Sequence, residues 1–187
     1  MAAEHELDDL LVAARAGAPW ALRRLYEALA PVVAGYLRLQ GVREVEDVTS
    51  EVFLGVFRGL EGFTGDAAAF RSWVFTIAHH RLIDERRRAG RRPVHEPLED
   101  AVVVPAGDTE DEALAALGGV WVADALDALT DEQREVVALR VLADVSVEET
   151  AAIVDKRPGA VRAIQHRALR RLRAALEQGR VSDPRGS

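Results

Sequence analysis

The sequence predicts an all-α protein in which two helical domains are joined by a flexible acidic linker, the second domain containing a helix-turn-helix. Apolar residues recur at helical spacing through residues 6–88 and again through residues 112–176, which indicates helices rather than strands. Between these parts, residues 93–117 contain three prolines and seven acidic residues, a composition typical of a solvated connection. Residues 146–176 show two helical patterns separated by a short polar turn, as in a helix-turn-helix.

The first two helices are expected at residues 6–16 and 19–40, with Gly17 between them. Leucines at helical spacing give both helices an apolar face, which is typical of scaffold helices that bury one side. Pro31 lies inside the second pattern, where its ring removes a backbone hydrogen bond, so a kink or an interruption is expected there. Gly41 is expected to end this helix.

A third helix is expected over residues 44–60, and its sequence is apolar on more than one face. The main stripe consists of Val45, Val48, Val52, Val56 and Leu60, and the large apolar residues beyond it are Phe53, Leu54 and Phe57. The remaining side is acidic and polar. Two interpretations stay open from the residues alone: a helix buried in the middle of a bundle, which a wide apolar surface favours, and an acidic surface that docks a basic partner helix.

A glycine-containing loop at residues 61–68 precedes a fourth helix, which is expected over residues 70–88. Trp73, His80, Arg81 and Arg87 lie away from the apolar side of this helix. Aromatic rings and cations together favour single-stranded nucleic acid, because bases stack on the rings and phosphates pair with the cations. The alternative for Trp73 is a tryptophan of the core.

In the second domain, a helix is expected over residues 112–128 and another over residues 130–142. Thr130 with Gln133, and Ser146 with Glu149, have the spacing of capping boxes at helix starts. The helix-turn-helix comprises residues 146–155 and a basic helix that begins at Pro158, a residue suited to a first helical position. The apolar stripe of this basic helix is Val161, Ile164, Ala168 and Leu172. Its arginines face away from that stripe, which predicts major-groove binding, with a merely solvated basic face as the alternative.

Charge and composition narrow the class of protein. The formal net charge is −7, which excludes a uniformly basic DNA-coating protein, but arginines concentrate in residues 81–92 and 157–173. The chain has no cysteine, so disulfides and thiolate metal sites are excluded. No apolar run reaches the ~20 residues that span a bilayer, and the acidic first residues lack the features of a signal peptide. A cytoplasmic protein without membrane insertion is therefore expected.

Three segments in this order resemble the extracytoplasmic-function group of bacterial sigma factors. They are EDVTSEVFLGVF at residues 46–57, FRSWVFTIAHHRLIDERRR at residues 70–88, and LTDEQREVVALRVLADVSVEETAAIV at residues 129–154, followed by the helix-turn-helix. The resemblance covers residues 8–92 and 122–175. It implies a region 2 domain at residues 8–92 and a region 4 domain at residues 112–177. The acidic linker then covers residues 93–111, and the terminal residues 178–187 are expected to form a disordered tail.

By this resemblance, three sets of residues carry the function. The set that binds the clamp helices of the largest subunit of core RNA polymerase is Asp47, Ser50, Glu51, Leu54 and Phe57. The set that captures a flipped base of the promoter −10 element and holds the melted strand is Phe63, Thr64, Gly65, Asp66, Trp73, His80, Arg81 and Arg87. The set that contacts the −35 element in the major groove is Arg157, Gly159, Arg162, Ala163, His166, Arg167 and Arg170. The chain departs from the family pattern at His79-His80 and at Ile164-Gln165.

The resemblance further implies core RNA polymerase, promoter DNA and an anti-sigma factor as partners, with no cofactor, no metal and no catalytic residue. A free-standing helix-turn-helix regulator is the main alternative, but it leaves the motifs of residues 46–88 unused. An anti-sigma or adaptor protein gives no reason for the two basic helices. An enzyme or a metal site would have to use His79, His80, Asp84 and Glu85, for which no further ligand at a recognisable spacing is found.

Overall fold

The computed structural model describes residues 2–89 and 125–181, with side chains for residues 6–88 and 125–177. The predicted acidic linker at residues 93–111 and the predicted helix up to residue 124 lie outside the described residues. All regular secondary structure in the described residues is helical, and they contain no strand, in agreement with the all-α prediction. Residues 178–181 continue the last helix, so this part of the predicted disordered tail is wrong, and residues 182–187 are not described.

The first part of the chain forms a bundle of α1 (Ala2–Arg15), α2 (Pro19–Leu39), α3 (Val45–Gly59), the short helix η1 (Leu60–Gly62) and α4 (Ala67–Ala89). Pro31 does not interrupt α2. Its neighbours Leu29, Ala30 and Val33 are buried, and their packing offsets the lost hydrogen bond. Helix α4 begins three residues earlier than predicted, at Ala67, because Asp66 accepts hydrogen bonds from the first turn of the helix.

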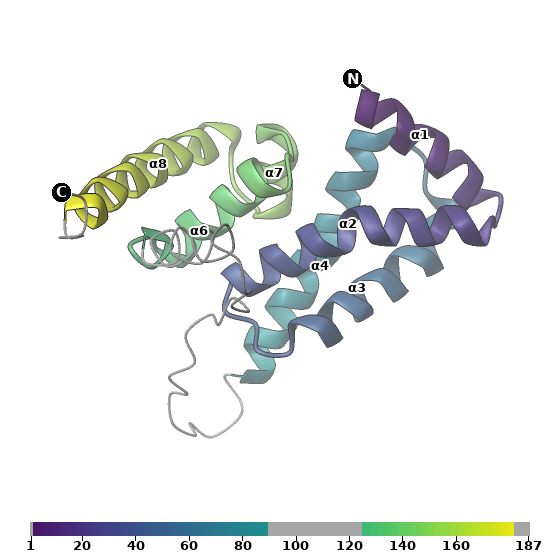
Figure 1. The fold of residues 1–187 in the computed structure, drawn as a ribbon, viewed down its shortest axis with the longest axis horizontal. Coiled ribbons are helices and arrows are strands. Elements are labelled where there is room, and N and C mark those ends of the chain that lie inside the picture. The colour runs from purple at the N-terminus through teal and green to yellow at the C-terminus, as the bar shows by residue number, and fades with distance from the viewer. Residues whose placement is uncertain (1, 90–124, 182–187) are drawn as a thin grey trace, which may run out of the picture.

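The second part contains α6 (Asp131–Val137), the π-helical turn η2 (Ala138–Leu142), α7 (Val147–Ile153) and the long helix α8 (Pro158–Val181). Residues 130–142 were expected to form one α-helix. Instead, the last five residues form the wider π turn, and Asp144 follows at a φ of 52°. The chain then turns directly into α7. Figure 1 shows these helices grouped beside the α1–α4 bundle.

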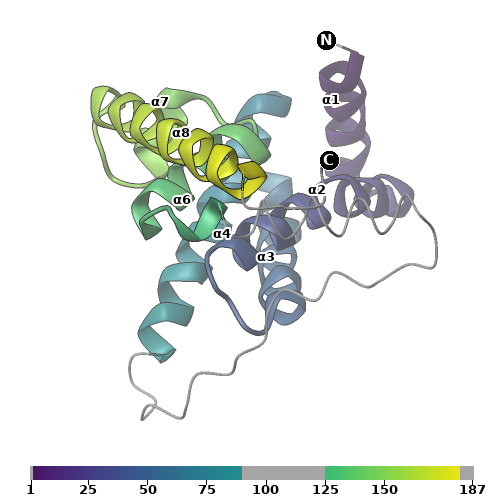
Figure 2. The ribbon, with the colours of Figure 1, turned by 60° about the vertical axis from the view of Figure 1, so that its left-hand side comes forward.

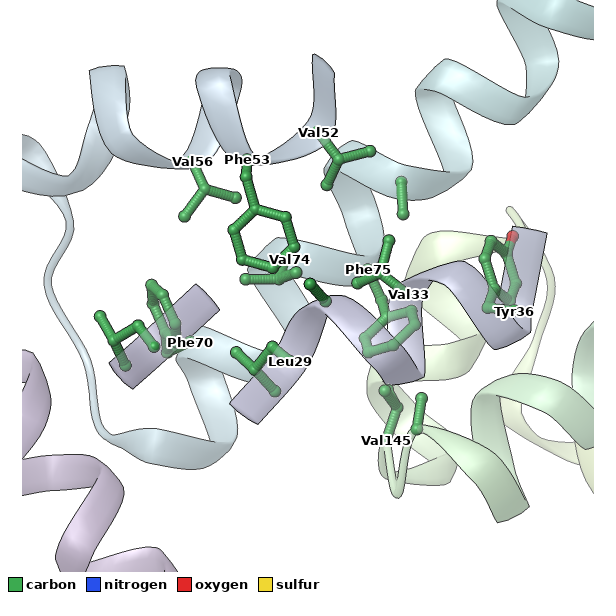
Figure 3. Close-up of a cluster of buried hydrophobic side chains, with 14 of the residues drawn as sticks. Leu29, Val33, Tyr36, Val52, Phe53, Val56, Phe70, Val74, Phe75 and Val145 are labelled. Atoms are coloured by element: carbon green, nitrogen blue, oxygen red, sulfur yellow. The ribbon is translucent and has the colours of Figure 1, made fainter. Parts of the chain in front are cut away.

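The largest apolar core lies between α2, α3 and α4, and Figure 3 shows its side chains. Its members include Val33, Tyr36 and Phe75, each fully buried. The rings of Tyr36 and Phe75 meet edge to face, with centroids 5.6 Å apart, a favourable arrangement for aromatic pairs. All five residues of the predicted α3 stripe are buried, which confirms that face of the helix.

The same core continues into the second part of the chain. Ala138, Leu139, Ala143, Val145 and Ile153 are buried in one cluster with residues of α1–α4, and Figure 3 shows Val145 facing the side chains of α2 and α4. Helix α2 contacts η2, and α4 contacts α7, so the two parts lie side by side in both ribbon views (Figure 2). We call this packing of the two parts against each other the closed arrangement.

Candidate nucleic-acid interface

The helix-turn-helix is fixed at both ends of its first helix by local hydrogen bonds. The Ser146 hydroxyl accepts a bond from the Glu149 N–H, and the Glu149 carboxylate accepts one from the Ser146 N–H, each at 3.1 Å. At the other end, Asp155 adopts a φ of 51° and the Lys156 N–H donates to the Ala151 carbonyl at 2.8 Å, as in a Schellman cap. Pro158 then begins α8. The predicted capping box and turn are confirmed.

Helix α8 buries one face and exposes the other. Val161 and Ile164 pack with Val136 and Ala151, and Ala168 packs with Leu129 and with Val137 of α6, which confirms the predicted apolar stripe. Every predicted −35 residue is exposed, on or just before α8: Arg157, Gly159, Arg162, Ala163, His166, Arg167 and Arg170. Their spacing of three or four residues places those in the helix along one side. A single basic face of α8 therefore remains open to solvent.

Two members of this region already have partners within the second part of the chain. Arg162 donates to the Glu148 carboxylate of α7 at 2.8 Å, and both side chains are exposed. Gln165 accepts a hydrogen bond from Arg140 at 3.3 Å. The two residues of α8 that depart from the family pattern have structural roles, since Ile164 is buried and Gln165 links α8 to η2 by a hydrogen bond.

The predicted polymerase-binding residues form a stripe along the outer side of α3. Asp47, Ser50 and Leu54 are exposed, and Glu51 and Phe57 are partly buried. The Leu54 side chain is 53% exposed. Beside the stripe, α2 and α3 enclose a groove of about 450 Å³ to which Ser50 contributes. Each of the two interpretations of α3 therefore describes one side of the helix. The valine stripe is buried in the bundle, and the acidic side with Leu54 is exposed to solvent.

The predicted −10 loop lies between η1 and α4 and has defined geometry. Gly65 has a φ of 147°, and a Cβ there would lie 2.8 Å from the Cβ of Ala69, so only glycine fits without strain. The Asp66 carboxylate accepts the Ala69 N–H at 2.9 Å. Thr64 is exposed. The loop thus presents a short exposed tip directly before the first turn of α4.

Trp73 is partly buried beneath this loop. Its ring stacks on Phe63, with centroids 5.0 Å apart and planes 20° from parallel. The other edge of the ring lies against Gly59, where an added Cβ would be 2.8 Å from Trp73 Cζ2. One face of Trp73 is therefore covered by Phe63, and the pair acts as one aromatic unit that supports the loop. Gly59 was not singled out from the sequence.

The remaining predicted −10 residues lie along the outer side of α4. His80 and Arg87 are exposed, and Arg81 is partly buried. Arg81 lies 3.8 Å from the Glu51 carboxylate of α3, so it links the −10 set to the polymerase-binding set. Arg87 lies 3.7 Å from Asp84. The loop tip and these side chains of α4 thus lie on one helical bundle, and their role at the −10 element stays a prediction.

Comparisons with known protein families match the two parts of the chain separately. Residues 25–92 match the Sigma-70 region 2 family and residues 125–174 match the Sigma-70 region 4 family. The chain is 36% identical over 177 residues to the ECF RNA polymerase sigma factor SigD of Mycobacterium tuberculosis, covering 90% of this chain and 83% of SigD. The chain belongs to the ECF RNA polymerase sigma factors. As a sigma factor it is a DNA-binding specificity subunit that directs RNA polymerase to promoters, with region 2 for the −10 element and region 4 for the −35 element.

Further relatives support the same assignment. The sigma factor is 36% identical over 138 residues to ShbA of Streptomyces griseus, covering 72% of each chain. Among solved structures, CnrH in complex with the cytosolic domain of CnrY matches with a TM-score of 0.62 and 26% identity, over 92% of this chain and 98% of that chain. RpoE of Bartonella quintana in complex with the anti-sigma factor NepR shares the fold, with a TM-score of 0.60 and 18% identity.

One cluster of polar residues at the boundary between the two parts of the sigma factor was missed by sequence reasoning. Glu135 of α6 accepts a hydrogen bond from the Tyr36 hydroxyl at 2.9 Å, and the same carboxylate oxygen lies 2.7 Å from His79 Nδ1. Tyr36 is fully buried, and the His79 and Glu135 side chains are 14% and 12% exposed. His79, a departure from the family pattern, therefore faces region 4. Since Tyr36 and Glu135 are 99 residues apart, no local pattern could have indicated the contact.

The cluster changes the acidity of its members. Burial raises the pKa of Glu135, but the hydrogen bond and charge of His79, the Tyr36 hydrogen bond and the charge of Arg86 together hold that pKa below its ordinary value. Burial, followed by the charge and hydrogen bond of Glu135, raises the pKa of Tyr36 well above its ordinary value. Glu135 is therefore a carboxylate and Tyr36 a neutral donor at neutral pH.

Other kinds of site are not found in the described parts of the chain. Within residues 2–89 and 125–181, no group of three or more histidine and acidic side chains is placed to hold a metal ion. In those same ranges, no helix is long and apolar enough to cross a membrane.

Proposed function

We propose that this sigma factor acts as a non-catalytic, cytoplasmic subunit whose region 2 domain (residues 8–92) binds core polymerase and opens the −10 element. Its region 4 domain (residues 112–177) recognises the −35 element as duplex DNA. The observation that carries this proposal is the exposed face of α8, where the seven −35 residues are open while the apolar stripe of the same helix is buried. This is the arrangement in which a recognition helix can enter a major groove.

Core polymerase binding is proposed for the α3 stripe of Asp47, Ser50, Glu51, Leu54 and Phe57. An exposed leucine flanked by carboxylates and next to a groove has the character of a docking site for a helix with basic and apolar residues. Because Leu54 is exposed, truncation should not disturb the fold of the bundle.

For the −10 element, we propose that the tip formed by Thr64, Gly65 and Asp66 captures the flipped base. The Phe63–Trp73 pair forms the floor of that site, and His80, Arg81 and Arg87 lie along the path of the melted strand. Stacking on an aromatic floor offsets the cost of taking a base out of the duplex, on the order of a few kcal/mol. The −35 contacts are proposed for Arg157, Gly159, Arg162, Ala163, His166, Arg167 and Arg170.

An anti-sigma factor is proposed as a further partner. The solved complex of CnrH with the cytosolic domain of CnrY supports this proposal, since CnrH is 26% identical to this chain. No described residue identifies the chemistry of that partner.

The decisive experiment is run-off transcription with bacterial core RNA polymerase on a pooled promoter library, with Arg162→Ala as the key variant. Loss of a base contact weakens specific binding by roughly 1–3 kcal/mol, so −35-dependent transcripts should fall about 5- to 150-fold while co-elution with core polymerase is unchanged. Arg23→Ala, which removes an exposed arginine of α2 outside all three sets, is the matched control. An equal loss of polymerase binding by Arg162→Ala would contradict the assignment.

A second variant separates polymerase binding from DNA binding. Leu54→Ala should weaken co-elution with core polymerase, with duplex −35 binding by the free protein unchanged. Val12→Ala removes another exposed apolar side chain, on α1 and outside the stripe. It should change neither co-elution with core polymerase nor duplex −35 binding. Normal polymerase binding by Leu54→Ala would remove α3 from the proposal.

A further inference from the structure

The first helix of the sigma factor contacts the −10 loop through one side chain. Asp8 of α1 accepts a hydrogen bond from the Ala67 backbone N–H at 2.6 Å, although the two residues lie 59 positions apart in the sequence. Asp8 is partly buried and belongs to none of the three predicted sets. Figure 1 shows α1 beside the start of α4. The sequence indicated only a scaffold role for α1, so a contact with the loop was not expected from it.

Ala67 is the residue at which the loop ends and α4 begins. It directly follows the tip formed by Thr64, Gly65 and Asp66, and it is 2% exposed. A buried N–H without an acceptor is costly, and the first N–H groups of a helix have no partner within the helix. Asp8 supplies the acceptor with a charged group, which the positive end of the helix dipole favours. The hydrogen bond therefore holds the junction between the tip and α4 against α1.

The other carboxylate at this junction acts differently. Asp66 accepts the Ala69 N–H at 2.9 Å, and this contact lies within one turn of α4, so it fixes the first turn but not its place in the bundle. Asp8 lies on another helix, whose Leu7 and Leu11 are buried in the common core. The Asp8 bond therefore ties the end of the tip to the rigid part of the bundle.

The other end of the tip is held as well. The Phe63 N–H donates to the Leu60 carbonyl at 3.1 Å, and the Phe63 ring stacks on Trp73. Thr64 and Gly65 thus connect two anchored points, so the tip has its shape before DNA arrives. A site that is already ordered binds more tightly than one that becomes ordered on binding, because the entropy of ordering is lost during folding.

We propose that Asp8 is a positioning residue for the −10 element: by holding the Ala67 N–H, it keeps the tip in the shape that receives the flipped base. Asp8 acts through the backbone of Ala67 and does not itself touch DNA. This inference rests on the proposed −10 role of the loop. It makes α1 a part of promoter recognition, although no side chain of α1 belongs to the −10 set.

Asp8→Asn tests the proposal, because it keeps the size of the side chain and replaces a charged acceptor by a weaker neutral one. Asp9→Asn, at the exposed next position of α1, loses the same charge and is the matched control. If charge alone mattered, both variants would bind a DNA strand more tightly. Loss of positioning in Asp8→Asn has the opposite sign, so the direction of the change separates the two causes.

Hydrogen exchange of the backbone amides measures the contact in the free, full-length protein. Exchange of the Ala67 amide should be about 5- to 10-fold faster in Asp8→Asn than in Asp9→Asn, since a weaker acceptor protects it less. The amide of Val74, a fully buried residue of α4, should exchange equally in both variants and shows that the helix remains folded. Equal exchange of Ala67 in the two variants would overturn the proposal.

The consequence is measured on the complex with bacterial core RNA polymerase. The template is a promoter that wild type selects from the pooled library, opened beforehand across the −10 element and carrying either the preferred or a substituted base at one −10 position. The ratio of the two affinities is the readout, because a loss of folded protein lowers both affinities equally. This ratio should fall about 3- to 10-fold in Asp8→Asn and further in Asp8→Ala, which has no acceptor, and should keep the wild-type value in Asp9→Asn.

A wild-type ratio in Asp8→Asn would show that Asp8 only supports the fold, and would overturn the proposal. Co-elution with core polymerase and duplex −35 binding should be unchanged in Asp8→Asn, because neither the α3 stripe nor α8 takes part in the contact; an equal loss of either would mark a general defect and would also overturn it. Absence of any base preference in wild type would instead contradict the proposed −10 role of the loop, and the exchange result on the Asp8 contact would stand.

Discussion

The Glu135 side chain links the two parts of the sigma factor. Its carboxylate oxygen contacts Tyr36 and His79 from the other part of the chain, and Arg86 adds a favourable charge. The three groups come from α2 and α4, two helices of the first part that contact the second part of the chain. Protonation of Glu135 should therefore weaken the contact between the two parts.

Stability should accordingly fall at acid pH. The pKa of Glu135 is lower in the folded protein than its ordinary value of 4.5, so its contribution is present above pH 4.5 and is lost as the pH falls through the lowered pKa. Urea unfolding at pH 7 should show wild type more stable than Glu135→Gln by about 1–3 kcal/mol. Measured again towards pH 3, the difference should shrink. A difference that is constant with pH would contradict the proposed role of the charge.

Two glycines of α3 should respond oppositely to the same substitution. A Cβ at Gly59 would lie 2.8 Å from the stacked Trp73 ring, whereas a Cβ at Gly55 would lie 3.4 Å from Ile77, an ordinary contact. Gly59→Ala should therefore lower the free energy of unfolding by about 1–3 kcal/mol. Gly55→Ala should raise it by about 0.5–1 kcal/mol, because alanine favours the helix. Urea titration of both variants provides the measurement, and a stabilising Gly59→Ala would show that Trp73 is free to move.

At the scale of elements, the sequence was most informative where local chemistry decides the structure. The capping boxes of Thr130 with Gln133 and of Ser146 with Glu149 appear as predicted, because both partners lie within one turn of helix. The π turn η2 and the early start of α4 were not predicted. The π turn η2 lies where a helix end packs against α2, and α4 begins early because Asp66 caps its first turn. The spacing of apolar residues contains neither feature.

The turn of the helix-turn-helix offers a test at this scale. Asp155 holds a φ of 51°, a conformation in which glycine is favoured over other residues. Asp155→Gly should stabilise the protein by about 0.5–1 kcal/mol, whereas Ala152→Gly, at an exposed position inside α7, should destabilise it by about 1 kcal/mol. Thermal unfolding of the two variants should move in opposite directions. A loss of stability in Asp155→Gly would mean that the aspartate side chain itself holds the turn.

At the scale of the molecule, the two helical parts share one core. The sequence predicted the two parts and which faces of their helices are buried, but not that Leu139 and Val145 would be covered by region 2. The contact joins residues that are far apart in the sequence. The pattern of apolar residues predicts that a residue is buried, but not whether its own part or the other part of the chain covers it. The positions of the predicted site residues were better anticipated, since helical spacing alone places the −35 set along one side of α8.

A shared core predicts that the two parts unfold together. In Leu139→Ala, the loss of a fully buried leucine should cost about 2–5 kcal/mol and should weaken the coupling between them. Calorimetry should then show a single transition for wild type and two resolved transitions for the variant. Leu169→Ala, which truncates an exposed leucine of α8, should keep the single transition. Two transitions already in wild type would contradict the shared core.

The ion pair between Arg162 and Glu148 gives DNA binding the character of an exchange reaction. In its proposed −35 role, Arg162 has to give up the carboxylate that it holds at 2.8 Å before it can contact a base. A guanine edge offers two acceptors to one guanidinium and can replace that carboxylate. An edge that offers a poorer arrangement leaves the arginine on Glu148. The pair therefore lowers the affinity for every DNA sequence that Arg162 contacts, and Glu148→Gln should bind those sequences up to about 5-fold more tightly, since an exposed ion pair contributes about 0–1 kcal/mol.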